Sequence, residues 1–450
     1  MSVKMSKDTG FLERTFKLNE HKTNVKTEII AGITTFMTMA YILIVNPLIL
    51  HDAGMDFGAV FTATALASVV ATLIMAFYAN LPFALAPGMG LNAYFAYTVV
   101  LGMGYPWEFA LTAVLLEGLI FILLSFFNVR EAIIDSIPIN LKHAVSVGIG
   151  LFIAFIGLAN AGIVDSAKFI TPEGKLDGLI VGLGDLTQAA PLLAIIGIVI
   201  TGLLLAKGVK GALLLGILIT TVIGIPMRVT SLPEQMKFVS LPPSLSPIFF
   251  KFDFSQIFSL NMLIVLFSFL FVDIFDTIGT LVGVSSKADM LDKDGKVPNA
   301  KQALFADAVG TTVGACLGTS TVTTYVESAA GVAEGGRTGL TALSAAGMFA
   351  LSLLLSPLFI MIPSAATAPA LVIVGLFMMS PIKKIDLDDF TEAIPAFLTI
   401  VMMPLAYSIA EGIVFGMVSY VALKVLTGKG NKVSPVMYVL ALLFILKFII

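Results

Sequence analysis

Long apolar runs that carry almost no charge alternate along the chain with short segments rich in Pro, Gly and charged residues. Residues 29–50 and 110–127 are two such runs. A helix needs about 20 apolar residues to cross the hydrocarbon core of a bilayer. The pattern therefore predicts an all-α integral membrane protein built from many spanning helices.

The runs form two sets of seven, separated by a polar, proline-rich stretch. The first seven spans are expected at residues 27–49, 57–79, 84–101, 107–127, 142–162, 190–207 and 210–226. The second seven are expected at residues 259–284, 301–318, 322–332, 338–361, 364–380, 391–410 and 411–427. Pro, Gly and charged residues mark the boundaries between them.

This division predicts five parts. They are a cytoplasmic N-terminal segment (1–26), a first seven-span repeat (27–226), a linker outside the cytoplasm (227–258), a second seven-span repeat (259–427) and a C-terminal tail (428–450). The end of the tail is too short to span comfortably. It either lies along the membrane surface or makes a fifteenth span.

The distribution of Lys and Arg tests this arrangement. Of the 26 Lys and Arg residues, 20 fall in the N-terminal segment or on the side of the even-numbered loops, 5 fall on the other side, and Lys447 lies in the tail. Cytoplasmic loops of membrane proteins collect Lys and Arg. We therefore expect a multi-pass protein of the cell membrane with both main termini in the cytoplasm.

Composition agrees and excludes other classes. The 450 residues are 58% hydrophobic and 12% charged, whereas soluble domains have roughly 45–50% and about 25%. A net charge of −3, with no basic cluster beyond the N-terminal segment, argues against nucleic-acid binding. One cysteine, Cys316, and three scattered histidines indicate neither a disulfide nor a metal site. No cofactor motif is present.

Two expected spans contain segments that disfavour a continuous helix. Residues 82–92 place Pro82, Pro87, Gly88 and Gly90 inside the third span. Residues 318–331, in the tenth span, are rich in hydroxyl and β-branched side chains, which favour extended backbone. Unpaired backbone amides are costly in hydrocarbon, so irregular backbone is tolerated only around a protein-lined or water-filled site.

The positions of the two breaks indicate an internal repeat. Each break lies in the third span of its set of seven. Two related halves with an odd number of helices insert in opposite orientations, and their broken helices then meet near the membrane midplane. We therefore expect inverted repeats of seven spans, with the site between the two breaks.

Carboxylates inside the spans are the candidate chemistry. The eighth span carries Asp273, Asp276 and Thr277 on one helical face. A charged carboxylate at the bilayer centre costs at least about 2.5–3.5 kcal/mol. Repulsion between two carboxylates then favours a bound proton or a hydrogen-bond donor. Asp307 and Glu327 follow in spans nine and ten, and we interpret these carboxylates as proton-coupling or ligand-binding groups. Asp307, which is nearer a helix start, could instead stabilise the N-terminus of its helix.

Residues of the two breaks complete the candidate site. We expect Gly88, Thr323 and Asn92 to border a ligand, although the Asn92 amide could instead bond to the opened backbone. Phe83 could stack on a planar ligand. Glu117, Glu392 and Glu411 also lie in or beside apolar runs, but no chain break accompanies them, and we interpret them as structural pairs or helix ends.

These side chains suit one kind of ligand. Carboxylates accept hydrogen bonds from N–H groups, and backbone amides at the breaks donate to carbonyl oxygens. No Lys or Arg is expected inside to balance an anion. The site is therefore expected to hold a neutral planar heterocycle, and sulfate, bicarbonate or phosphate would fit poorly.

Three motifs resemble one family of transporters. They are Ala-Pro-Gly-Met-Gly-Leu-Asn-Ala-Tyr-Phe at 86–95, Phe-Val-Asp-Ile-Phe-Asp-Thr-Ile-Gly-Thr-Leu at 271–281 and Thr-Ser-Thr-Val-Thr-Thr-Tyr-Val-Glu-Ser at 319–328. Together with Glu-Gly-Gly-Arg-Thr-Gly-Leu-Thr at 334–341, they resemble the AzgA-like purine permeases of the nucleobase/cation symporter (xanthine/uracil permease) superfamily.

The resemblance implies several further properties. It implies fourteen spans in core and gate domains, with short antiparallel strands in spans three and ten. It also implies proton-coupled uptake of adenine, guanine or hypoxanthine. By motif, the binding carboxylates would be Asp273 and Glu327, supported by Asn92, Asp276, Thr277 and Asp307. The expected partners are a purine nucleobase, protons and the lipid bilayer, with a second copy of the chain as an open alternative.

Alternatives remain at this stage. The same architecture could carry another neutral heterocycle, such as xanthine or uracil, or an anion. A membrane enzyme is disfavoured because no catalytic triad, metal-binding or cofactor motif is present. A channel is disfavoured because a site of broken helices suggests one binding event per transport cycle.

Overall fold

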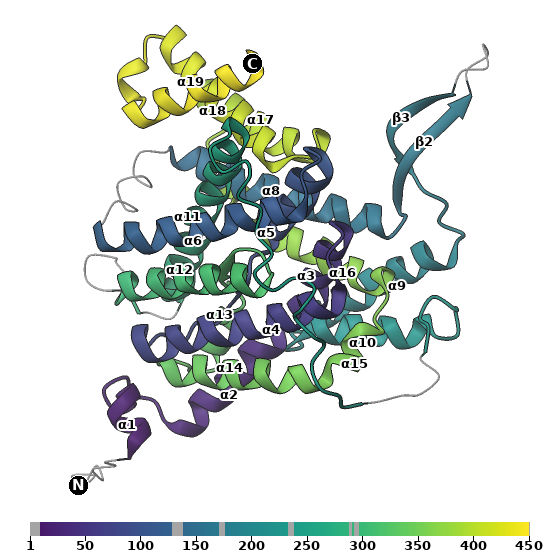
Figure 1. Ribbon diagram of the computed structural model, residues 1–450, viewed down its shortest axis with the longest axis vertical. Coiled ribbons are helices and arrows are strands. Elements are labelled where there is room, and N and C mark those ends of the chain that lie inside the picture. Colours follow the sequence, from purple (N-terminus) through teal and green to yellow (C-terminus); the bar gives the residue numbers. More distant parts are fainter. Residues whose placement is uncertain are drawn as a thin grey trace.

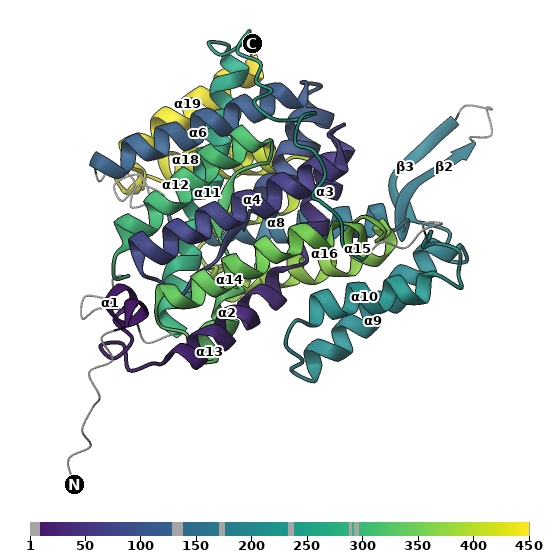
Figure 2. The same ribbon diagram turned by 60° about the horizontal axis from the view of Figure 1, so that its bottom comes forward.

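A computed structural model describes residues 10–127, 138–170, 176–232, 238–287, 290–291 and 297–449. In both ribbon views the helices form one bundle, with α1 at one face and the β2–β3 hairpin extending from the opposite face (Figures 1 and 2). The expectation of an all-α membrane protein is confirmed by its many long apolar helices.

The first half of the chain contains most of the helices that surround the first break. Its elements are α1 (Phe11–Phe16), α2 (Val25–Met39), α3 (Ile42–Asp52), α4 (Phe57–Ile74) with a π-helical end (Met75–Ala79), β1 (Leu85–Pro87), α5 (Met89–Ala93) with a π-helical continuation (Tyr94–Gly102), α6 (Trp107–Phe127), α8 (Ile139–Asn160), β2 (Val164–Ile170), β3 (Leu176–Leu183), α9 (Ala189–Ala206) and α10 (Ala212–Gly224).

The second half repeats this pattern of long helices around a short strand. Its elements are α11 (Leu260–Lys287), α12 (Ala300–Leu317), β4 (Val322–Thr324), α13 (Ser328–Ala333), α14 (Gly339–Ser352), α15 (Ser356–Ile360), α16 (Ser364–Met378), α17 (Phe390–Leu405), α18 (Ile409–Leu426) and α19 (Pro435–Ile449), with 3-10 turns at Leu353–Leu355, Ser380–Lys384 and Gly430–Lys432.

Membrane-spanning helices account for most of the predicted spans. Within the described residues, eight helices are long and apolar enough to cross a bilayer: Val25–Asp52, Phe57–Ala79, Trp107–Ser125, Ile139–Asn160, Ala189–Ala206, Gly339–Ile360, Ser364–Lys384 and Ile409–Leu426. Ala212–Gly224, Leu260–Ile274 and Phe390–Leu405 are shorter apolar helices. The remaining predicted spans overlap α12 and the two segments that contain β1 and β4. The chain is therefore a multi-pass membrane protein.

The helices pack in two groups. In the first, which we call the strand-bearing group, the long helices α2, α3, α4, α6, α11, α12 and α14 pack around β1 and β4. In the second, which we call the flanking group, α8, α9, α10, α16, α17 and α18 pack on one another. α8 and α16 approach closely, because a Cβ on Gly150 would lie 2.6 Å from the Gly375 carbonyl oxygen. Small residues allow such close packing of membrane helices.

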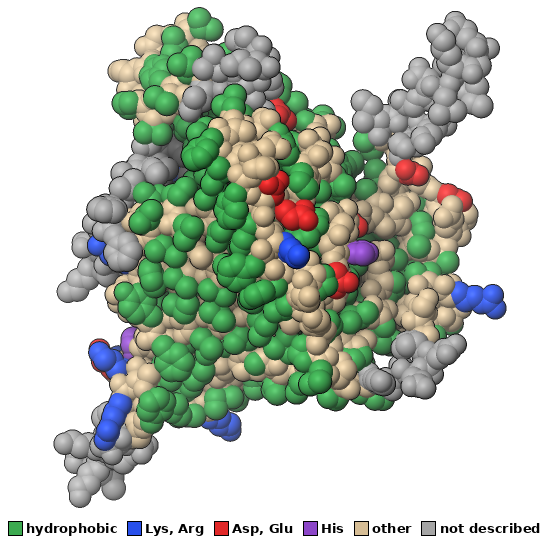
Figure 3. All heavy atoms as spheres, in the orientation of Figure 1, with side chains coloured by type: hydrophobic (Ala, Val, Ile, Leu, Met, Phe, Trp, Pro, Cys, Tyr) green, Lys and Arg blue, Asp and Glu red, His purple; other side chains and the backbone are tan. Residues whose placement is uncertain are grey.

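The surface fits a bilayer environment. Figure 3 shows a face covered largely by hydrophobic side chains, with charged side chains confined to a few places. Exposed residues of this kind include Val199, Val222, Phe397 and Leu405, each at least 60% exposed. Apolar side chains facing outward are expected where lipid replaces water as the solvent.

Two features of the fold go beyond what the sequence predicted. The segment after the fifth span forms an antiparallel hairpin, β2–β3, which was not predicted. The tail helix α19 is not isolated, because Met437 is fully buried and the Phe444 ring lies 5.7 Å from that of Phe267. Whether α19 crosses the membrane or lies along it stays a prediction.

A buried glutamate that sequence analysis overlooked anchors the start of α14. Glu28 accepts hydrogen bonds from the hydroxyls of Thr338 (2.8 Å) and Thr341 (2.6 Å) and from the backbone N–H of Arg337 (2.9 Å). A carboxylate at a helix N-terminus bonds to otherwise unpaired N–H groups. This contact gives the Glu-Gly-Gly-Arg-Thr-Gly-Leu-Thr motif a structural role.

Candidate functional site

The two breaks form a two-stranded antiparallel sheet in the interior. Leu85 of β1 pairs with Thr324 of β4, and Pro87 pairs with Val322. All residues of both strands are buried. The implied strands in spans three and ten are thereby confirmed, and the two breaks lie side by side as expected.

Two threonines bond to the outer edges of this small sheet. Thr72 of α4 accepts a hydrogen bond from the Leu85 N–H (3.0 Å) and donates to the Leu85 carbonyl (3.2 Å). Thr311 of α12 does the same for Val322, at 3.1 and 3.0 Å. Because no further strand covers either edge, these hydroxyls provide the pairing that buried backbone requires.

Gly88 is required by the closeness of the strands. A Cβ at this position would lie 2.9 Å from Oγ1 and 3.0 Å from Cγ2 of Thr323. The Gly88 N–H donates to the Thr321 carbonyl at 2.9 Å. Only a residue without a side chain leaves this contact undisturbed.

A cavity lies beside the strands, and we call it the strand cavity. Residues from five segments line it: Tyr41, Gly88, Met89, Gly90, Asp276, Thr280, Thr323, Thr324, Tyr325, Val326, Glu327, Val374 and Met378. Its volume is about 50 Å³, room for only one or two water molecules. Val374 and Met378 belong to α16, so the flanking group closes one wall.

Two carboxylates reach this cavity from different elements. Asp276 comes from α11, and Glu327 lies three residues after β4 and directly before α13. Tyr41 donates a hydrogen bond to Glu327 Oε1 at 2.7 Å, and Thr323 donates to Asp276 Oδ2 at 3.5 Å. The cavity lining contains no Lys, Arg or His.

A second cluster of polar side chains lies between α11 and α12. Thr277 bonds to Asp273 Oδ1 at 3.2 Å and to Asp307 Oδ1 at 3.0 Å, and all three side chains are fully buried. None of the three lines the strand cavity. The expectation that Asp273, Asp276 and Thr277 share one face is therefore only partly correct, because Asp276 faces the cavity and the other two face α12.

Two other expected residues also lie outside the cavity lining. The Asn92 amide donates to the Pro87 carbonyl at 3.5 Å and accepts a hydrogen bond from Ser320, so it bonds to the opened backbone and its partner segment. Phe83 is fully buried in a hydrophobic cluster with Leu81 and Leu281. Its ring therefore packs within the protein and away from the cavity.

Glu117 has a closer relation to the site than its sequence context suggested. This fully buried carboxylate of α6 accepts a hydrogen bond from Thr321, which precedes β4. It therefore supports the second break directly. The hydroxyl-rich composition of residues 318–331 could have predicted this contact, because a buried hydroxyl needs a hydrogen-bond partner.

Several residues of the cavity lining were not predicted. Thr280 lies four residues after Asp276 and so shares its helical face, a signal that the spacing did contain. Tyr41 and Tyr325 carry no comparable signal, because apolar helices commonly contain tyrosine. Met378 of α16 also lies at the cavity, and methionine is equally common in apolar helices.

The remaining membrane carboxylates have structural partners. Glu392 forms an ion pair of 2.7 Å with Lys424, which is only 2% exposed, and this bears out its interpretation as a structural pair. Glu411 lies in the first turn of α18, where its N–H bonds to Ser408. No group of three or more potential metal ligands occurs among the described residues.

Asp389 caps α17 outside the spans. The Thr391 hydroxyl and the Lys429 ammonium, 3.0 Å away, hold the pKa of this carboxyl well below its usual range. Such a group stabilises the fold above its unfolded pKa, and the contribution is lost only as pH falls through the lowered value. The cap is therefore intact across the pH range of an ordinary transport assay.

Interrupted helices that meet at an interior cavity with unbalanced carboxylates are typical of membrane transporters. The fold and the site are thus those of a membrane transporter. Residues 26–442 match the Permease family, and the chain belongs to that family.

Curated relatives agree with this assignment, and a solved structure has a similar fold. The adenine permease AdeP of Escherichia coli (strain K12) is 44% identical over 98% of this chain and 96% of the relative. The guanine/hypoxanthine permease PbuO of Bacillus subtilis (strain 168) is 45% identical over 97% of this chain and 100% of the relative. The transmembrane domain of the cyanobacterial bicarbonate transporter BicA has a similar fold, with a TM-score of 0.63 at 17% identity, covering 87% of this chain and 97% of that one.

Proposed function

We propose that this protein is a secondary active transporter that takes purine nucleobases into the cell together with protons. Relatives at 44% and 45% identity are adenine and guanine/hypoxanthine permeases, and the likeness spans nearly the whole of each chain. The substrate class is therefore adenine, guanine or hypoxanthine.

The placement of Asp276 and Glu327 at one cavity carries the proposal. A purine presents several N–H donors and ring acceptors on its edge. Carboxylate oxygens accept from the N–H groups, and the hydroxyls of Thr323 and Tyr41, already bonded to these carboxylates, can donate or accept. No cationic side chain lines the cavity to compensate an anion, so a neutral base fits better than bicarbonate.

The overall arrangement supports a two-domain mechanism. We propose fourteen spans in two inverted repeats of seven, with the strand-bearing group as the core domain and the flanking group as the gate domain. Spans one to four and eight to eleven fall in the first group, and the remaining spans in the second. Thr72 in span two and Thr311 in span nine make the same bonds to equivalent strands, as related repeats would.

Substrate binding requires the two groups to separate. A cavity of about 50 Å³ is too small for a purine. We propose that α16 moves away from the strands when the base binds. Protonation of Asp276 or Glu327 removes the repulsion between two neighbouring negative charges and so permits binding. Deprotonation on the cytoplasmic side then releases the base, which couples proton and purine movement.

Uptake assays in proteoliposomes test the proposal. Radiolabelled hypoxanthine, guanine, adenine and xanthine should be offered at two external pH values with the internal pH held constant. We expect purine accumulation that rises as the external pH falls and collapses when a protonophore is added. Accumulation that ignores the pH gradient would contradict proton coupling, and preferential competition by uracil would contradict the substrate class.

A further inference from the structure

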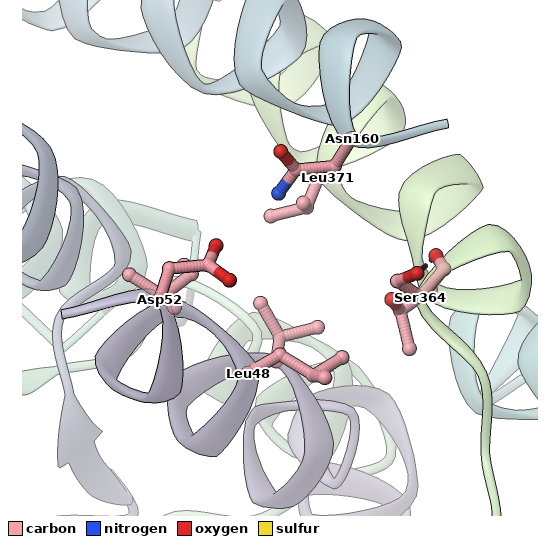
Figure 4. Close-up of a pocket in the computed structure, with 8 residues that line it drawn as sticks. Leu48, Asp52, Asn160, Ser364 and Leu371 are labelled. Atoms are coloured by element: carbon pink, nitrogen blue, oxygen red, sulfur yellow. Dashed lines mark hydrogen bonds between the residues drawn. The ribbon is translucent and has the colours of Figure 1, made fainter. Parts of the chain in front are cut away.

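A second cavity lies at the end of α3 that is far from the strands, and we call it the end cavity. Figure 4 shows Asp52 and Asn160 pointing into it, with Leu48 and Leu371 beside them and Ser364 on the opposite side. The lining is half polar and half apolar: Val45, Leu48, Ile49, Asp52, Asn160, Ser364, Thr367 and Leu371. Its volume is about 200 Å³, larger than that of the strand cavity.

The two cavities lie along the same helix faces. On α16, Ser364, Thr367 and Leu371 line the end cavity, and Val374 and Met378 continue the same stripe to the strand cavity. Steps of three or four residues keep a stripe on one side of a helix.

The first span repeats this arrangement. Tyr41 lines the strand cavity, and Val45, Leu48 and Asp52 follow at helical spacing in the end cavity. The two cavities therefore lie one after the other along the same sides of α3 and α16.

A hydrogen-bond bridge crosses between the groups beside the end cavity. Tyr97, on the π-helical continuation of the first broken span, donates to Asp52 Oδ2 at 2.7 Å and accepts from Asn160 Nδ2 at 3.2 Å. Asp52 belongs to the strand-bearing group, and Asn160 ends α8 of the flanking group. The polar atoms of the cavity thus also hold the two groups together at this end.

We propose that the end cavity is a loading site, where a neutral planar nitrogen heterocycle binds before it reaches Asp276 and Glu327. The Asp52 carboxylate accepts from a ring N–H, the Asn160 amide pairs with a neighbouring carbonyl or ring nitrogen, and Leu48 and Leu371 flank the flat faces. The base competes with Tyr97 for Asp52, so loading weakens the bridge and favours separation of the groups. This inference rests on the proposed transport of purines.

Kinetics measured from each side of the membrane test the loading site. Leu371→Trp fills the end cavity, whereas Leu376→Trp makes the same change at a position of the same helix that is 60% exposed and lines neither cavity. Hypoxanthine transport should be measured in right-side-out and inside-out vesicles. If the end cavity is a loading site, Leu371→Trp should raise the apparent KM only for transport that starts from that end. A general folding defect would instead change transport in both directions.

Asp52→Asn provides a second variant that keeps the shape of the side chain. We expect Asp52→Asn to raise the apparent KM for inward transport about ten- to a hundredfold, as for the loss of one charged hydrogen bond. Leu371→Trp should also raise it, because the indole ring fills the cavity. Leu376→Trp should behave as the wild type. If Leu371→Trp fails to fold, the result for Asp52→Asn alone tests the loading site.

The outcomes separate this inference from the function on which it rests. If the wild-type chain transports purines but Leu371→Trp and Asp52→Asn match Leu376→Trp from both sides, the loading site is wrong and the proposed function stands. Equal changes in both directions would also overturn the loading site. If the wild-type chain transports no purine, the proposed function fails and this inference fails with it.

Discussion

At the scale of single residues, Asp273 and Asp276 separate into different environments although both lie on α11. Three residues advance a helix by about 300°, so the two side chains diverge by about 60°. Asp276 reaches the strand cavity, and Asp273 bonds through Thr277 with Asp307 of α12. The motif resemblance assigned binding to Asp273, whereas the geometry favours Asp276 for contact with the substrate.

Substitution of each aspartate by asparagine distinguishes the two roles. Asp276→Asn should weaken hypoxanthine binding about ten- to a hundredfold with little loss of stability, because a charged hydrogen bond at the cavity is lost. Asp273→Asn should lower the Tm in detergent more and the affinity less. A scintillation proximity assay measures the affinity for hypoxanthine, and thermal unfolding measures the Tm. If Asp273→Asn lost more affinity and Asp276→Asn more stability, Asp273 would be the residue that binds the substrate.

Gly88→Ala tests the close approach of the two breaks. The added methyl group would displace Thr323, its neighbour at 2.9 Å, and with it the hydroxyl that donates to Asp276. We expect a loss of about 1–3 kcal/mol in unfolding free energy and a severalfold drop in uptake. Gly347→Ala is the matched control, because nothing lies within 4 Å of its added Cβ. Equal behaviour of the two variants would contradict the role of Gly88.

The sequence predicted part of the site at this scale. Gly88, Asp276, Thr323 and Glu327 were proposed and all line one cavity. Carboxylates are rare within apolar runs, and Gly88 and Thr323 lie in the two segments whose composition disfavours a continuous helix. Tyr41, Tyr325 and Met378 also line this cavity. Such residues are common in apolar helices, and only the tertiary packing of distant elements reveals which of them face a cavity.

At the scale of elements, Thr72 and Thr311 replace missing neighbours for the two strands. Each hydroxyl both accepts from and donates to the backbone of one strand residue. Isolated two-stranded sheets are marginal, so these contacts are expected to determine whether the breaks keep their extended form.

Thr72→Val and Thr311→Val remove only the hydroxyls. Each should cost about 1–3 kcal/mol because a buried N–H and C=O lose their partner. Thr→Ser at the same positions should cost much less, since the hydroxyl remains. Thermal unfolding in detergent, together with hypoxanthine uptake, checks both pairs. Valine variants as stable and active as the serine variants would show that the strands do not depend on these bonds.

Sequence analysis recovered the two broken spans and not the β2–β3 hairpin. Two prolines and two glycines close together in one apolar run disfavour a continuous helix, and a cluster of hydroxyl and β-branched side chains favours extended backbone. The hairpin at residues 164–183 lies outside the spans, where hydropathy carries little information. Its strands mix Gly, Asp and Lys with apolar residues, so alternation is weak.

At the scale of the whole molecule, the division into two groups follows the order of the spans. The first four and last three spans of each half fall in different groups. The positions of the two breaks predicted only the repeat of seven spans, and the division into core and gate domains was implied by the family resemblance. Which faces of the helices contact one another could not be derived, because membrane helices are apolar on nearly all sides.

Sided labelling tests the proposed orientation. In a Cys316→Ser background, Leu241→Cys in the linker and Leu387→Cys between α16 and α17 place thiols at positions that are 86% and 61% exposed. An impermeant maleimide applied to intact cells should label only the first, and the second after permeabilisation. Labelling of Leu387→Cys in intact cells would contradict a cytoplasmic location for that loop. It would also contradict the number of spans from which that location follows.

The central claim is that buried carboxylates at the strand cavity alternate between holding a proton and binding a purine. Proton movement driven by hypoxanthine, recorded with a trapped pH dye in proteoliposomes, tests it most directly. The wild type should acidify the lumen when hypoxanthine is added outside. Glu327→Gln, in a protein shown to be folded by its thermal unfolding, should abolish this signal. Proton flux of wild-type size in Glu327→Gln would contradict the account.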